Sequence, residues 1–170
     1  MAVITNGYQG LDWGNFLVAN VPLVMSEYGT NGYYYGMVSA PNVAFNDWGG
    51  PAEIDSPGTN FNFLSAYLTG AWNDNLNIEV QGFNGTNLLY DQTVVASATN
   101  PTLFAFNYLD IDSLTFNSFG GQKDPAFPPG GGAQFAMDNM SFEFVPEPST
   151  VLLAALGALA LYAFLKRKPG

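Results

Sequence analysis

FNFLSAYLTGAWNDNLNIEVQGFNGTNLLYDQTVV, residues 61–95, holds the pattern that decides the fold. In its central part, 76–83, alternate residues are apolar while those between them are polar, which is the period of a strand with one buried face. Asn84-Gly85 separates two such stretches, and both residue types tolerate the positive φ of a tight turn. The pattern therefore predicts strands over 61–72, 76–83 and 88–95, the last two joined as a hairpin.

Further strands are expected on the C-terminal side of this hairpin, over 103–109, 111–117 and 135–144. A loop rich in glycine and proline, 118–133, precedes the last of them. No segment before residue 149 shows an apolar stripe of helical period. Strands about ten residues apart without helices between them are typical of an antiparallel β-sandwich. We expect an all-β domain over 1–145, followed by a single apolar helix.

The chain carries a net charge of −10, from fourteen acidic and four basic residues. All of the acidic residues except Glu147 precede Val145, where Lys123 is the only basic residue. A domain with a single basic residue cannot neutralise the phosphates of a nucleic acid, which excludes nucleic acid as a partner. The chain has no cysteine and no histidine, so thiolate chemistry, serine–histidine couples and the usual zinc ligands are excluded as well.

The C-terminal segment has the composition of a membrane helix. Residues 149–165 form an uncharged stretch of seventeen, at the short end of the roughly 17–25 residues that span a bilayer. Three cations follow at once, Lys166, Arg167 and Lys168. Positive residues remain on the cytoplasmic side, so we predict a transmembrane helix over 149–165, a basic membrane stop over 166–168, and residues 1–145 outside.

The segment VPEPST at 145–150, the apolar helix and the basic cluster together resemble the PEP-CTERM sorting signal of Gram-negative, exopolysaccharide-producing bacteria. The resemblance implies that Pro146, Glu147 and Pro148 are read by an exosortase and that 146–170 serve as the sorting signal. It also implies a precursor held in the inner membrane through 149–165. The mature protein would then reach the cell surface or the extracellular space.

Export through such a route calls for an N-terminal signal peptide, yet the chain opens MAVITNGYQGLDW, with no basic region and no long apolar stretch. We expect that the sequence lacks its signal peptide and first strand.

The body resembles a recurrent ectodomain type of PEP-CTERM proteins, in NGYQGLDWGNF (6–16), SAPNVAFN (39–46), SAYLTGAWND (65–74) and FAMDNMSF (135–142). The resemblance implies a jelly-roll sandwich of the carbohydrate-binding or galactose-binding kind. Relatives open with a strand carrying an acidic pair, which this sequence does not show.

Asp138 is the candidate metal ligand. By period two it shares a strand face with Ala136, Met140, Phe142 and Phe144, so we expect it to face the core. A buried carboxylate requires a partner, and basic partners are scarce in this body. Jelly-roll binding modules use a last-strand aspartate to hold calcium, which prefers oxygen ligands. The resemblance thus makes Asp138 a candidate calcium ligand, and a hydrogen-bonded or strand-end aspartate is the other interpretation.

Exposed aromatic residues are the candidates for stacking on sugar rings. The run Tyr33-Tyr34-Tyr35 is favoured, because consecutive residues of a strand alternate faces and one tyrosine must then point away from the core. Trp48 is a further candidate. We expect a non-enzymatic surface or matrix protein, carbohydrate-binding or structural, whose partner is exopolysaccharide. The alternative is a carbohydrate-active hydrolase that uses carboxylates alone, with Asp110 and Asp112 as the candidate pair.

Overall fold

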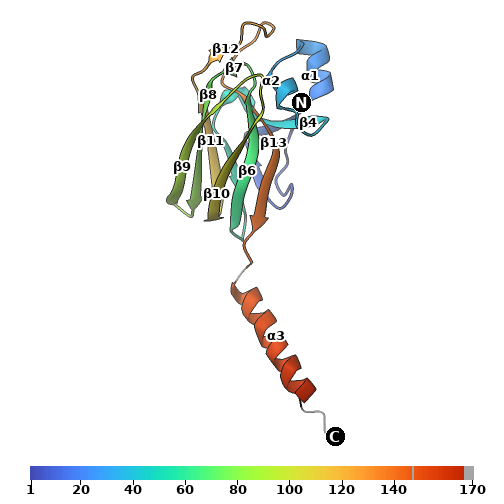
Figure 1. Ribbon diagram of the computed structural model, residues 1–170, viewed down its shortest axis with the longest axis vertical. Helices are drawn as coiled ribbons and strands as arrows, with labels where there is room; N and C mark the ends of the chain where they lie inside the picture. The colour runs from blue at the N-terminus through green and yellow to red at the C-terminus, as the bar shows by residue number, and fades with distance from the viewer. Residues whose placement is uncertain (147, 167–170) are drawn as a thin grey trace.

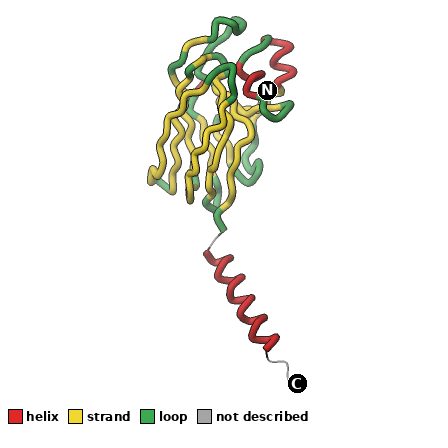
Figure 2. Tube along the Cα trace, viewed as in Figure 1, coloured by secondary structure: helices red, strands yellow, loops and turns green. Residues whose placement is uncertain are grey.

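The computed structural model describes residues 1–146 and 148–166, and its body is a sandwich of two antiparallel sheets (Figures 1 and 2). The six-stranded sheet contains, in spatial order, β1 (Ala2–Val3), β3 (Phe16–Asn20), β4 (Asn42–Asn46), β13 (Phe135–Phe144), β6 (Phe61–Gly70) and β10 (Thr102–Ile111). The five-stranded sheet contains β2 (Asp12–Gly14), β5 (Ala52–Asp55), β11 (Ser113–Phe119), β8 (Leu76–Asn84) and β9 (Asn87–Ala96). A short ribbon pairs β7 (Asn73–Asp74) with β12 (Gln122–Lys123). This architecture confirms the predicted β-sandwich.

The main core lies between the two sheets and is rich in aromatic rings. Phe16, Phe63, Phe116 and Phe135 are fully buried, and their rings meet mostly edge to face at 5.6–6.3 Å between centroids. Edge-to-face contacts suit the ring quadrupole and add to the energy of burial. A second cluster lies on the outer face of the six-stranded sheet, where Val21, Val24 and Tyr33 pack near Ala136.

The expected strands are present. The predicted hairpin joins β8 to β9, and Gly85 in its turn adopts a φ of 58°. The segment 118–133 contains only the end of β11 and the two-residue β12, in agreement with the expected loop.

Two short helices before residue 149 correct the expectation that none occurs there. α1 (Val21–Tyr28) begins after Asn20, whose side chain accepts a hydrogen bond from the Leu23 N–H. α2 (Gly32–Gly36) follows and contains all three consecutive tyrosines. α2 is close to the sheet because Gly32 and Gly36 lack a Cβ: one added at Gly32 would lie 1.9 Å from the Gly70 carbonyl oxygen. The tyrosines are therefore helical, and strand alternation does not apply to them.

A bulge in β13 corrects the predicted face of Asp138. Phe135 and Met137 face the main core, but Asn139 adopts a φ of 50° and the pairing with β6 shifts register after Asp138. Beyond this bulge Met140 and Phe142 turn to the core in their place. Asp138 thus lies with Ala136 on the outer side of the sheet, and it is not directed into the space between the sheets.

α3 (Pro148–Lys166) follows the last strand and extends away from the sandwich (Figure 1). Its leucines at 153, 156, 159 and 161 are exposed. Within the described residues, no helix satisfies both the length and the apolarity required to cross a membrane.

Candidate functional site

Trp48 is the most exposed large aromatic side chain of the body, with 88 % of its surface accessible. It lies at the centre of the turn η1 (Asp47–Gly49), at the end of β4, and its own φ is 52°. A left-handed conformation costs a non-glycine residue roughly 1–2 kcal/mol, and an exposed indole ring recovers none of that cost by burial. Strain of this kind persists where the surrounding structure enforces it, which is a common property of functional sites.

Hydrogen bonds on both sides hold the Trp48 turn in place. The Asn15 side chain donates to the carbonyl oxygens of Asp47 and Pro51, at 3.3 and 2.9 Å. The fully buried Asn46 donates to the Gly50 carbonyl at 2.9 Å and accepts from the Phe135 N–H at 2.8 Å. The turn is therefore fixed to the start of β13, so the exposed ring is carried on a rigid support.

A cavity of about 350 Å³ opens beside Trp48. Tyr28, Asp47, Trp72 and Gln134 contribute to its walls, together with the backbone of Gly130 and Gly131. The Gln134 Oε1 atom is buried and has no hydrogen-bond partner. A buried acceptor of this kind is expected to receive a donor from water or from a ligand.

The chemistry of this cavity suits a neutral hydroxylated ligand. Among the described residues, its walls include one carboxylate, Asp47, and no lysine or arginine, and Met1 also lines them. An anion would therefore find no lysine or arginine to pair with, whereas sugar hydroxyls can donate to the Asp47 carboxylate. Trp48 supplies an apolar ring face for the C–H side of a pyranose.

The other stacking candidates have different positions. Tyr33 is buried and packs edge to face on Phe45 and Trp72, at 5.2 and 6.2 Å. Burial raises its pKa well above the ordinary value. Tyr35 is half-buried and stacks on Phe127, and Tyr34 is the most open of the three, with 40 % of its surface exposed. Trp48 thus joins Tyr33 in the walls of the cavity, and Tyr34 and Tyr35 do not belong to it.

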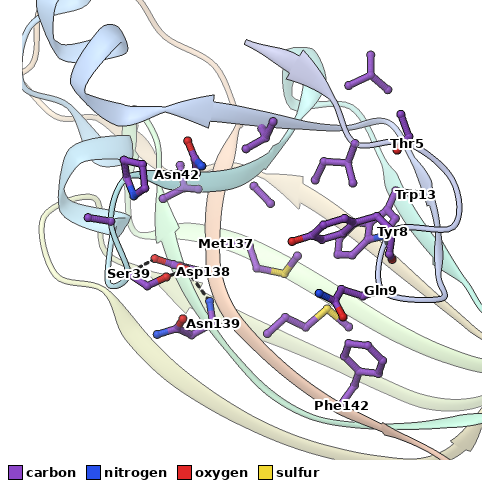
Figure 3. Close-up of a pocket in the computed structure, with 18 residues that line it drawn as sticks. Thr5, Tyr8, Gln9, Trp13, Ser39, Asn42, Met137, Asp138, Asn139 and Phe142 are labelled. Atoms are coloured by element: carbon purple, nitrogen blue, oxygen red, sulfur yellow. Dashed lines mark hydrogen bonds between the residues drawn. The ribbon is translucent and has the colours of Figure 1, made fainter.

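Asp138 lies in a second, larger hollow of about 720 Å³, beside Ser39 (Figure 3). Ser39 donates to both carboxylate oxygens, and the Asn139 N–H donates to Oδ1 at 2.8 Å. These three donors account for a buried carboxylate. Among the residues described, no three acidic side chains gather into a metal-binding group. Calcium at Asp138 is not tested by these contacts and would need backbone carbonyl or amide oxygens as further ligands, whereas the hydrogen-bonded aspartate, the other interpretation, fits them.

Asp110 and Asp112 accept hydrogen bonds from residues of nearby loops and turns. Asp110 adopts a φ of 58° and accepts from the Asn60 side chain at 2.8 Å. Asp112 lies between β10 and β11 and accepts from the Gly85 N–H at 2.8 Å. Neither residue contributes to the walls of the two cavities described above.

The residues of the predicted sorting signal follow β13 closely. Pro146 is exposed, and Pro148 begins α3. Glu147, Arg167 and Lys168 lie outside the described residues, so the sorting motif and the basic stop are only partly described. A helix is present at 149–165 as expected, but its function as a transmembrane helix is not confirmed.

Comparison with known proteins identifies the C-terminal segment. The family model for the PEP-CTERM protein-sorting motif matches residues 144–168. No curated protein matches the chain.

Two solved structures resemble the fold. One is TmCBM61 in complex with β-1,4-galactotriose, with 9 % identity and a TM-score of 0.42, covering 84 % of this chain and 94 % of that one. The other is the family 32 carbohydrate-binding module of C. perfringens NanJ in complex with galactose, with 13 % identity and a TM-score of 0.37, covering 64 % and 82 %. At such low similarity neither structure carries an argument about the ligand of this chain.

The sorting motif determines the destination of the protein. It marks a secreted precursor that is anchored at its C-terminus and afterwards reaches the cell surface or the extracellular space, and it implies processing by an exosortase. The chain is thus a β-sandwich protein that carries a PEP-CTERM sorting motif at residues 144–168.

Proposed function

We propose that this protein is a non-enzymatic glycan-binding protein of the bacterial surface or matrix, and that its ligand is a neutral exopolysaccharide. Trp48 carries the proposal, because its exposed ring is held on a strained turn by buried hydrogen bonds. A residue held in a strained conformation by the surrounding structure is a common feature of functional sites. The precursor is held in the inner membrane by residues 149–165 until the exosortase acts at Pro146–Pro148.

The cavity beside Trp48 supports the same ligand class. Stacking on the ring supplies affinity that varies little with the sugar, while hydrogen bonds to the Asp47 carboxylate distinguish hydroxyl orientations. Among the described residues, neither lysine nor arginine lines the cavity, which favours neutral sugars over sulfated or uronic ones.

A glycan array probed with the full chain and with Trp48→Ala tests the proposal. We expect the wild type to bind neutral polysaccharides and Trp48→Ala to lose at least tenfold in affinity, with unchanged melting temperature. Leu103→Ala, a matched change at an exposed apolar residue of β10, should bind as the wild type does. Failure of the wild type to bind any neutral glycan would contradict the proposal.

The hydrolase alternative is disfavoured by the positions of its carboxylates. Asp110 and Asp112 hydrogen-bond to neighbouring turns and lie outside the walls of both cavities. Release of reducing ends from a polysaccharide, abolished in Asp110→Asn and Asp112→Asn, would restore that alternative.

A further inference from the structure

The six-stranded sheet has a gap beside its central strand. β4 pairs with β13 only through Ala136–Phe45 and Met137–Ala44, and β4 begins at Asn42. β13 continues to Phe144. Over Asn139–Phe144, therefore, β6 is the only paired neighbour of β13 in the described chain. Alternate backbone N–H and C=O groups of this six-residue edge point away from β6 without a strand partner.

The hollow around Asp138 lies along this unpaired edge (Figure 3). Met137, Met140 and Phe142 of β13 line one side, and the segment around Ile4 and Thr5 lines the other. At the usual rise per residue of a strand, Asn139–Phe144 extend over about 20 Å. The hollow beside them has a volume of about 720 Å³. The side chains of Met140 and Phe142 are half-buried and pack on the main core. We refer to this hollow as the β13 groove.

We propose that the β13 groove receives an extended strand of another polypeptide, which pairs with β13 and completes the sheet. The unsatisfied backbone edge selects a peptide over a glycan, because only a second backbone matches its alternating donors and acceptors. The apolar floor beside that edge selects apolar side chains at alternate positions of the incoming strand.

Charge determines which polypeptide fits. Asp138 is the only acidic or basic residue of the described chain that lines the groove, and Glu143 follows on the same strand. The surrounding body contains Lys123 as its single basic residue. A second copy of this acidic body would be repelled, whereas a strand with lysine or arginine at its ends is attracted. The partner strand is therefore apolar at alternate positions and basic at its ends.

A blocked peptide of alternating valine and threonine with a lysine at each end tests the proposal against the full chain. We expect saturable binding, and amide hydrogen exchange of residues 140–144 slowed at least tenfold by the peptide. The same peptide with N-methylated amides on its pairing edge should bind at least tenfold more weakly, since it keeps the side chains but cannot form the ladder. Glutamates in place of the lysines should weaken binding several-fold, and salt should reduce that difference.

Thr5→Trp places a large ring in the groove from an exposed rim position, so it should reduce peptide affinity at least tenfold without loss of stability. Leu103→Trp, the matched change on β10 at the opposite edge of the sheet, should alter affinity less than twofold.

Three results would overturn the inference. The first is equal affinity for the peptide and its N-methylated form. The second is slowed amide exchange on β10 instead of β13 when the peptide is bound. The third is a dimer of this chain in which the β13 amides are already protected from exchange without any peptide.

Discussion

Ser39 and Asp138 lie 99 residues apart in sequence and are joined by two hydrogen bonds: the Ser39 N–H reaches Oδ2 at 2.6 Å and the Ser39 hydroxyl reaches Oδ1 at 2.7 Å. These bonds attach the segment after α2 to the last strand of the sheet. Hydrogen bonds to a charged group contribute about 1.5–3 kcal/mol each. We expect Asp138→Asn to lower the free energy of unfolding by about 1–3 kcal/mol and Ser39→Ala by about half of that. Urea unfolding of both variants and of the double variant measures their coupling, and strictly additive losses would show that the two residues act independently.

Calcium provides a second measurement on Asp138. Because three donors already satisfy its carboxylate, we expect the chain to melt at the same temperature in calcium and in sodium at matched ionic strength. A calcium-specific rise that disappears in Asp138→Asn would establish the metal site instead.

Trp48→Gly should separate stability from binding. Glycine adopts a φ of 52° without the steric cost that tryptophan has, so we expect stability equal to the wild type or greater by up to about 1 kcal/mol. Glycan affinity should nevertheless fall at least tenfold, since the stacking ring is lost. Thermal melting and calorimetric titration of one sample measure both quantities. A clear loss of stability would mean that the ring supports the fold.

Asn46→Ala should remove the support of the Trp48 turn. The change leaves the buried Phe135 N–H without its acceptor and the Gly50 carbonyl without its donor. We expect a loss of about 2–3 kcal/mol in urea unfolding, with weaker glycan binding at temperatures where the variant is folded. Asn42→Ala, at the exposed start of the same strand, is the matched control and should cost less than about 0.5 kcal/mol.

Because the pKa of Glu53 on β5 is raised, we expect the stability of the fold to depend on pH. Partial burial, with the nearby charge of Asp55, raises the pKa of Glu53. A carboxyl with a raised pKa in the folded state favours folding when protonated, and this contribution is lost as the pH rises through the folded pKa. Glu53→Gln should therefore melt higher than the wild type at pH 7, and the difference should vanish below about pH 4, where the unfolded glutamate is also protonated. Glu27→Gln, an equal change of charge on the exposed side of α1, controls for general repulsion.

Processing at the sorting motif can be followed by mass spectrometry of the mature protein. In a host with an exosortase, we expect mature protein that lacks residues after about Pro148, and precursor that accumulates in the inner membrane when Pro146 or Glu147 is changed to alanine. Surface-exposed protein that retains Lys166–Lys168 would contradict this prediction.

Local periodicity was sufficient to predict the long strands. β6, β8, β9, β10, β11 and β13 all agree with the expected strands within a few residues. β8 shows the reason most clearly, since buried residues alternate with half-buried ones from Leu76 to Gly82. α1 and α2 escaped this reasoning because eight and five residues are too few to show a helical stripe. The Asn-Gly and Gly/Pro signals, in contrast, correctly predicted where chain direction changes.

The positions of Trp48 and Asp138 depend on structural features that the strand periodicity of the sequence does not show. One residue with positive φ, Asn139, changed the faces of β13 and moved Asp138 to the outside of the sheet. The exposure of Trp48 depends on Asn46, whose partner Phe135 is 89 residues away. Asn-Asp before the tryptophan was an available signal for a turn there, but the sequence contains nothing that shows the buried network beneath it.

The path of β13 has a mechanical consequence for a tethered protein. The strand begins at Phe135, which holds the Trp48 turn through Asn46, and ends at Phe144, where the sorting motif starts. If a glycan binds at Trp48 as proposed, tension between it and the C-terminal sorting segment would run along β13. β6 pairs antiparallel with it over most of its length, so the load acts on this ladder in shear. Ladder bonds lie perpendicular to the strands and share a shearing force instead of opening one after another. Such a load would be resisted by a ladder between two strands of ten residues each.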